Sequence, residues 1–100
     1  MKFYSTRNKN LRLSAKEAFN KGLADDSGLF LPEFIPSLDS SFFKNLNKKS
    51  FQEIAFEVSK KFLAEEINDH QLEKIINEAF NFPCPLKQLD QNLYVLELFH

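Results

Sequence analysis

Two neighbouring segments, residues 50–63 and 68–80, each combine a helix cap with a helical apolar period. Ser50 and Glu53 have the three-residue spacing of a capping box, and Asn68 is a common N-cap residue at the start of the second segment. Apolar residues then recur every three or four positions in both segments, which predicts two amphipathic helices. These helices must bury one face each, so this pair constrains the fold more than any other feature.

Weaker signals predict two further helices. Ser14 and Glu17 form another capping box, and the helix that they open ends near Gly22. Residues 39–46 fit a short fourth helix. Strands are expected at residues 2–7, 28–32 and 93–99, and residues 82–86 are expected to be extended because of two prolines. The sequence therefore predicts one α+β domain over residues 1–100, mostly helical, with about four helices and a few short strands.

Composition excludes several classes of partner. The net charge of −1 argues against nucleic acid, and no apolar stretch approaches the roughly 20 residues that span a membrane. The single cysteine, Cys84, permits no internal disulfide and favours a reducing, cytoplasmic setting. The chain has twelve phenylalanines and no tryptophan. This predicts a phenylalanine-rich core, with some rings left over to face a partner.

Most residue types with catalytic potential have no suitable neighbours. His70, Cys84 and His100 are too far apart in sequence for a metal-ligand motif, so no metal site is predicted. The adjacent carboxylates Asp25 and Asp26 are interpreted as turn formers rather than an acid/base pair. The residues alone contain no complete active site.

The segment Ser5-Thr6-Arg7 is the best candidate for ligand contact. Two hydroxyls beside a guanidinium can bind a phosphate or carboxylate, because arginine offers a planar fork of donors. From the residues alone, a plain edge strand is the simpler interpretation.

The end of the sequence raises a different question. Residues 93–99 read LYVLELF, and only Tyr94 and Glu97 interrupt the apolar run. A strand that is apolar on both faces needs cover on both faces. An uncovered strand also offers free edges, so the chain on its own is expected to self-associate through residues 93–99.

Four segments, taken together, resemble the start of the threonine synthase family. They are FYSTR, KEAFNKGLADDSGLFLPEFIP, SFQEIAFEVSKKF and NLYVLELFH, in an order and spacing that cover essentially the whole chain. The most specific are residues 23–32 and 97–100.

This resemblance implies a longer protein of the tryptophan-synthase-β-like type, fold-type II, which uses pyridoxal 5'-phosphate. Members convert O-phospho-L-homoserine and water to L-threonine and phosphate. In the family, a Gly-Pro-Thr turn and the cofactor lysine follow the strand that resembles residues 94–100. The resemblance thus implies an N-terminal segment whose catalytic domain lies beyond residue 100 and packs against it. No catalytic or cofactor-binding residue is expected within it, and the segment alone is expected to be inactive.

Substrate contacts are the part of the site that the resemblance assigns to this chain: Ser5, Thr6, Arg7 and His100. Two departures matter. A glycine is expected soon after the arginine but is absent, and Ser27 stands where the family often has a glycine. Ser27 is acceptable provided that Gly28 takes the left-handed conformation. Two alternatives stay open: a pyridoxal-phosphate-dependent phospholyase related to the synthases, and a free-standing helical interaction module without catalytic activity.

Overall fold

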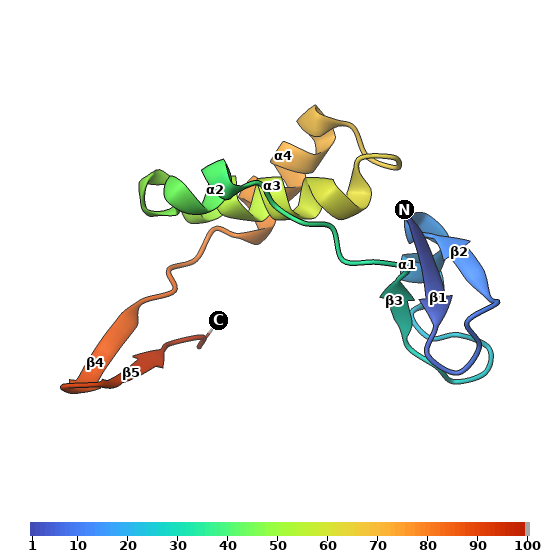
Figure 1. The fold of residues 1–100 in the computed structure, drawn as a ribbon, viewed down its shortest axis with the longest axis horizontal. Helices are drawn as coiled ribbons and strands as arrows, with labels where there is room; N and C mark the ends of the chain where they lie inside the picture. The colour runs from blue at the N-terminus through green and yellow to red at the C-terminus, as the bar shows by residue number, and fades with distance from the viewer. Residues whose placement is uncertain (100) are drawn as a thin grey trace.

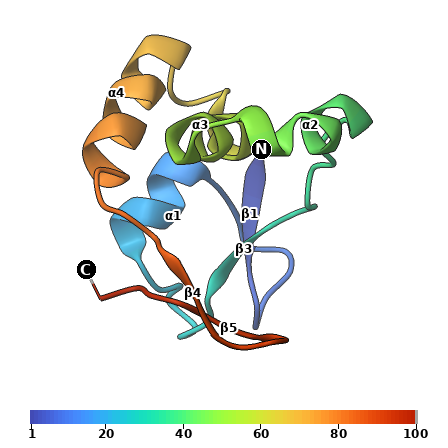
Figure 2. The same ribbon diagram turned by 90° about the vertical axis from the view of Figure 1, so that its left-hand side faces the viewer.

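The computed structural model describes residues 1–99, which form three units in chain order. Figure 1 shows a β unit with one helix at the N-terminal end, a group of helices across the top, and a β hairpin that projects away from both. The view in Figure 2 confirms that the hairpin lies below the helices.

The N-terminal unit is a three-stranded antiparallel sheet with one helix. The central strand is β1 (Lys2–Ser5), flanked by β2 (Arg12–Ser14) and β3 (Phe30–Pro32). Helix α1 (Ala15–Lys21) follows β2 directly and ends at Gly22, whose φ of 72° lies in the left-handed region. The expected helix and the two expected strands in this part of the chain are confirmed, although β1 ends at Ser5 rather than residue 7 and β3 begins at Phe30 rather than residue 28.

The helical unit contains α2 (Ser40–Lys44), the 3₁₀ turn η1 (Leu46–Lys48), α3 (Phe51–Leu63) and α4 (Asp69–Ala79). Helices α3 and α4 pack against each other, as their amphipathic faces predict.

The predicted caps are present at the three longer helices. The Ser14 hydroxyl accepts a hydrogen bond from the Glu17 N–H at 3.2 Å, and the Ser50 hydroxyl accepts one from the Glu53 N–H at 3.1 Å. Both glutamates bond back to the cap residue, which completes each capping box. The Asn68 side chain caps α4 in the same position. Each cap satisfies backbone donors that a helix end leaves without partners.

Two small groups of buried side chains form the core. The first contains Phe3, Ala15 and Ala18, between the N-terminal sheet and α1. The second contains Ala55, Leu72 and Ile76, between α3 and α4. The partly buried side chain of Leu63 packs against both groups and connects the two units.

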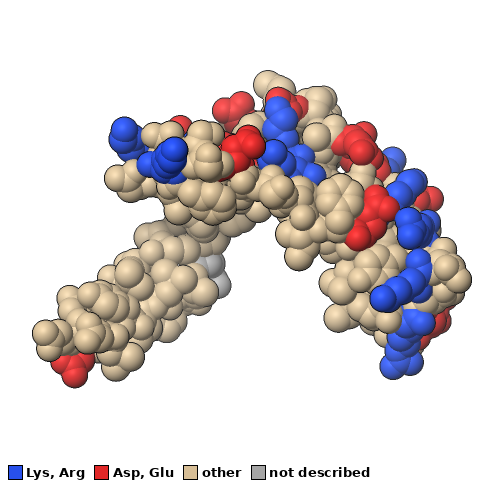
Figure 3. All heavy atoms as spheres, in the orientation of Figure 1, with Lys and Arg blue, Asp and Glu red and all other residues tan. Residues whose placement is uncertain are grey.

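The C-terminal arm, defined as residues 86–99, contains the antiparallel pair β4 (Leu86–Asp90) and β5 (Leu93–Leu96). Every residue of both strands is exposed, so neither face is covered by the rest of the described chain. Figure 3 shows that this arm is almost free of charged side chains on the face drawn. The exposed large apolar residues of the arm are Leu86, Leu89, Leu93, Tyr94, Val95, Leu96, Leu98 and Phe99.

The chain exposes more surface than a folded monomer of its size. Its accessible area is 7684 Å² at a mass of 11.7 kDa, whereas a typical monomer of this mass exposes about 5,900 Å². The radius of gyration is 16.7 Å, compared with about 13 Å for a compact domain of this length. The excess of about 1,800 Å² reflects the projecting arm and the separation of the units.

Three details differ from the sequence-based expectations. The described residues form five strands, in two sheets, where three strands were expected, because β2 is short and β4 is mixed in polarity, so neither has a clear apolar pattern. Strand β5 ends at Leu96, before the expected position 99. The core contains fewer phenylalanines than expected: among the twelve rings Phe3 and Phe42 are buried, and Phe30, Phe56 and Phe80 pack against the core but are only partly buried.

Candidate functional site

The Ser5-Thr6-Arg7 segment leaves the end of β1 and lies against the start of β3. The Thr6 N–H donates to the Leu29 carbonyl at 2.9 Å, and the Leu29 N–H donates to the Thr6 hydroxyl at 3.0 Å. These bonds extend the pairing of β1 with β3 beyond the strands themselves. Thr6 is exposed, and its hydroxyl hydrogen is not used by the bond from Leu29.

The Ser5 hydroxyl connects this segment to the turn that precedes β3. Ser5 is fully buried, with 0% exposure. Its hydroxyl is 2.7 Å and 2.9 Å from the two carboxylate oxygens of Asp26, to which it donates, and it accepts the Arg7 N–H at 3.2 Å. The hydroxyl thus joins the Asp26 carboxylate to the backbone of Arg7.

The turn at residues 24–28 is shaped by a close approach. The Asp26 carboxylate also accepts the Gly28 N–H at 2.9 Å. A Cβ atom at Gly28 would lie 2.1 Å from the Ser5 hydroxyl oxygen and 2.8 Å from Asp26 Oδ1. Only glycine leaves room for the Ser5–Asp26 bond at this position.

The left-handed residue of this turn is Ser27, with φ of 62°. The expectation that Gly28 takes this conformation is therefore wrong. Gly28 is needed for space, whereas a glycine at position 27 would relieve backbone strain.

The Asp26 carboxylate is ionised at neutral pH. The hydrogen bond from the Ser5 hydroxyl lowers its pKa from the ordinary value, as does the Gly28 N–H; burial opposes this, and the nearby charge of Arg7 lowers the pKa further. The neighbouring Asp25 has a different role, because its carboxylate pairs with the Lys21 ammonium at 2.6 Å on the surface. The two adjacent carboxylates therefore do not act together.

Arg7 is the member of the segment that is best placed to meet a ligand. Its side chain is exposed, and its guanidinium makes no hydrogen bond or ion pair within residues 1–99. Its backbone is held by Ser5. A fixed backbone with a free cationic fork suits the binding of a carboxylate or phosphate.

The structure thus brings Ser5, Thr6 and Arg7 together but separates their roles. The Ser5 hydroxyl faces inward to Asp26, so a direct ligand contact is left to Arg7 and the Thr6 hydroxyl. His100, the fourth predicted contact, lies outside the described residues. Sequence reasoning missed Asp26 and Gly28 as partners of this segment. The signal that could have identified them was their position within residues 23–32, one of the two most specific segments of the resemblance.

The chain's own lysines do not fit a pyridoxal phosphate site. A lysine that forms a Schiff base is activated by a desolvated pocket or a second cation, and none of the lysines is buried. Within residues 1–99, no group of three or more histidine, cysteine or acidic side chains could hold a metal ion. None of the described helices is long and apolar enough to cross a membrane.

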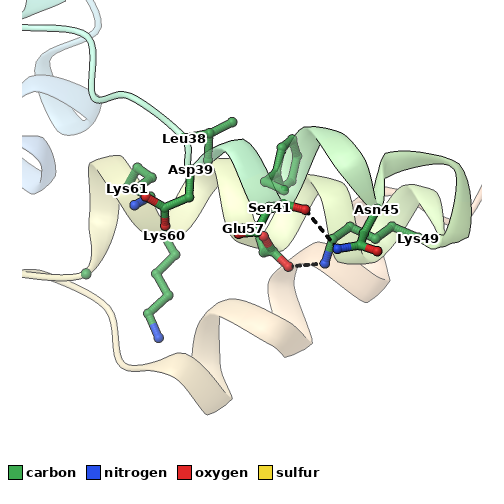
Figure 4. A pocket seen from close by; sticks show the side chains of 10 residues that line it. Leu38, Asp39, Ser41, Asn45, Lys49, Glu57, Lys60 and Lys61 are labelled. Carbon is green, nitrogen blue, oxygen red and sulfur yellow. Dashed lines mark hydrogen bonds and ion pairs between the residues drawn. The ribbon is translucent and has the colours of Figure 1, made fainter.

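A separate cavity of about 700 Å³ lies between α2 and α3 (Figure 4). The Lys49 ammonium is bonded to the Glu57 carboxylate, and the Asn45 amide donates to the Ser41 carbonyl at 2.9 Å. The Lys60 ammonium is bonded to Asp69. These groups already have partners, whereas the Asp39 and Lys61 side chains, which also line the cavity, have no hydrogen bond or ion pair within residues 1–99.

The fold and this segment define a small α+β module with a cationic loop and a large apolar surface that its own described residues leave uncovered. The family model described as "Threonine synthase N terminus" matches residues 2–80. The chain belongs to this family.

Curated relatives and solved structures agree with this assignment. The chain is 43% identical to threonine synthase of Schizosaccharomyces pombe, over 98% of this chain and 20% of that protein. The crystal structure of threonine synthase from Escherichia coli matches all of this chain with a TM-score of 0.92 at 30% identity. The pyridoxal-phosphate-bound threonine synthase from Brucella melitensis matches with a TM-score of 0.90 at 39% identity, and the chain covers 23% of it.

The chain therefore spans about a fifth of the length of the curated relatives that it matches. The α+β fold class and the resemblance to the N-terminal region of threonine synthases are confirmed.

Proposed function

We propose that this chain is the N-terminal domain of a cytoplasmic threonine synthase that converts O-phospho-L-homoserine and water to L-threonine and phosphate. The observation that carries the proposal is the match of the whole chain to two threonine synthase structures, with TM-scores of 0.92 and 0.90. The domain extends over residues 1–100, and the catalytic region is a further part of the same polypeptide.

In this proposal the chain binds and orients the substrate, and the catalytic region carries out the reaction. Pyridoxal phosphate, bound in the catalytic region, supplies the electron sink for the reaction. The Arg7 guanidinium binds the phosphate or carboxylate of the substrate through charge-assisted hydrogen bonds, and the Thr6 hydroxyl adds a donor beside it. His100 borders the same pocket.

The partner of the C-terminal arm is the catalytic region. Permanent interfaces are large and more hydrophobic than transient ones, and the uncovered apolar side chains of the arm suit an interface of this kind. The arm supplies apolar contacts such as Leu89 and Leu93, which are 63% and 55% exposed.

Without that partner, the 100-residue chain should self-associate through the arm. Sedimentation velocity should show a sedimentation coefficient that rises with protein concentration, and Leu93→Glu should shift the chain toward monomer because it places a charge in the contact. Glu33→Gln, far from the arm, is the control. A monomer at every concentration would contradict this proposal.

The test of substrate binding uses a hybrid enzyme in which residues 1–100 replace the matching segment of the Brucella melitensis threonine synthase. Arg7→Ala should raise KM for O-phosphohomoserine by about tenfold or more, because the lost charge-assisted bonds contribute about 1.5–3 kcal/mol. The kcat should stay within about twofold if the contact is equal in ground and transition states.

Lys9→Ala is the matched control, since it removes an exposed cation two residues away. An unchanged KM in Arg7→Ala, or an equal rise in both variants, would refute the role of Arg7 as an anion contact.

A further inference from the structure

The Ser5-Thr6-Arg7 segment and the Asp25-Asp26-Ser27-Gly28 turn, which are about twenty residues apart in sequence, form one hydrogen-bonded unit. Its centre is the Ser5 hydroxyl, which has one hydrogen to donate. That hydrogen is directed at the Asp26 carboxylate, so a lone pair of the same oxygen faces the Arg7 N–H at 3.2 Å. The orientation of the hydroxyl is thereby set by Asp26.

The charge of Asp26 strengthens this arrangement in two ways. A hydroxyl that donates to a carboxylate is polarised, which makes its oxygen a better acceptor for the Arg7 N–H. The negative charge also attracts the Arg7 guanidinium, yet the two groups do not form an ion pair within the described residues. The backbone of Arg7 is fixed by Ser5, while its exposed guanidinium stays available to an anion.

Other groups near the loop do not duplicate this role. The Asp25 carboxylate pairs with Lys21 and is 82% exposed, while Glu33 lies at the opposite end of β3, beside Lys2, and pairs with Arg12 at 3.2 Å. Asp26 is the acidic residue that bonds to the Ser5 hydroxyl. Asp26 therefore combines the negative charge and the hydrogen bond to Ser5.

We propose that Asp26 is a positioning residue that, through the Ser5 hydroxyl, sets the direction of Arg7 toward the anionic group of the substrate. This inference rests on the proposed function, because it takes Arg7 as the substrate contact. Asp26 itself touches no substrate.

The experiment is a double-mutant cycle in the hybrid enzyme described above, with Asp26→Asn, Arg7→Ala and the combined variant. Asp26→Asn keeps the size of the side chain and removes its charge. It should raise KM for O-phosphohomoserine about three- to tenfold and leave kcat within about twofold, since only substrate binding is weakened. The inhibition constant of inorganic phosphate should rise in parallel.

The combined variant carries the decisive prediction. If Asp26 acts through Arg7, adding Asp26→Asn to Arg7→Ala should change KM by less than about twofold, because coupled residues are not additive. Asp25→Asn makes the same charge change one residue away and should leave KM unchanged. Ser5→Ala removes the bridging hydroxyl and should reproduce the KM rise of Asp26→Asn, which provides a second test if the asparagine variant folds poorly.

The possible failures are distinguishable. An unchanged KM in Arg7→Ala overturns the proposed anion contact and this inference with it. A raised KM in Arg7→Ala together with an unchanged KM in Asp26→Asn and Ser5→Ala overturns only the inference. Additive effects in the combined variant also overturn it, because Asp26 would then act independently of Arg7.

Discussion

Gly28→Ala should lower the free energy of unfolding by about 2–5 kcal/mol, through overpacking and the loss of a buried hydrogen bond. The added Cβ would lie 2.1 Å from the Ser5 hydroxyl oxygen and 3.2 Å from the Arg7 backbone nitrogen. The Ser5 side chain can only move by giving up its bond to Asp26, and the backbone of Arg7 must then shift too. Urea unfolding of the chain, followed by circular dichroism, measures the change.

Gly22 provides the matched control. It has a φ of 72° but no atom within 4 Å of an added Cβ. Gly22→Ala should therefore cost only backbone strain, about 1–3 kcal/mol, because residues with a Cβ rarely adopt its φ of 72° and ψ of −63°. Equal losses in the two variants would mean that the close approach at Gly28 does not determine its identity.

Leu72→Ala should lower the free energy of unfolding by about 2–5 kcal/mol, because it leaves a cavity between α3 and α4. Leu72 is 1% exposed and is the largest fully buried side chain of the described residues. For a domain of this size, each kcal/mol lowers the melting temperature by roughly 4–8 °C. A thermal melt of the chain provides the measurement.

Ile75 lies on the same helix but is 49% exposed, so Ile75→Ala is the control. It removes an aliphatic side chain from a half-covered position and should have about half the effect or less. A small loss in Leu72→Ala would show that the packing of α3 on α4 is not the main source of stability in the helical unit.

The helices were predictable because their signals are local. Ser14 with Glu17 and Ser50 with Glu53 specify helix starts within four residues, and the structure has both boxes. Strand β2 was missed since three residues carry no period. Strand β4, the partner of β5 in the hairpin, was missed because its sequence LKQLD is mixed in polarity. Neither strand packs on a core of the described chain, so no buried face imposes an alternating pattern on β4.

The candidate site was only partly predictable for a related reason. The Ser5-Thr6-Arg7 segment has a recognisable chemistry, but the partner of Ser5 is 21 positions away in sequence. Nothing in the local pattern distinguishes Asp26, which bonds to Ser5, from Asp25, which pairs with Lys21. The distinction depends on the pairing of β1 with β3.

The exposure of several phenylalanines was also not predictable from the sequence. Large aromatic residues predict burial, yet Phe19, Phe43 and Phe99 are 65%, 60% and 89% exposed. A domain that is completed by a larger partner can place such residues on its surface, because their burial occurs in the interface rather than in its own core. Composition alone does not distinguish phenylalanines buried in the domain's own core from those buried in an interface.

The most direct test of the central claim is the activity of the hybrid enzyme. Residues 1–100, joined to the catalytic region of the Brucella melitensis threonine synthase, should release phosphate from O-phosphohomoserine and form an equal amount of threonine. Absorbance of the bound cofactor confirms that the catalytic region is intact. A hybrid that folds and retains the cofactor but forms no threonine would contradict the assignment of this chain as the N-terminal domain of a threonine synthase.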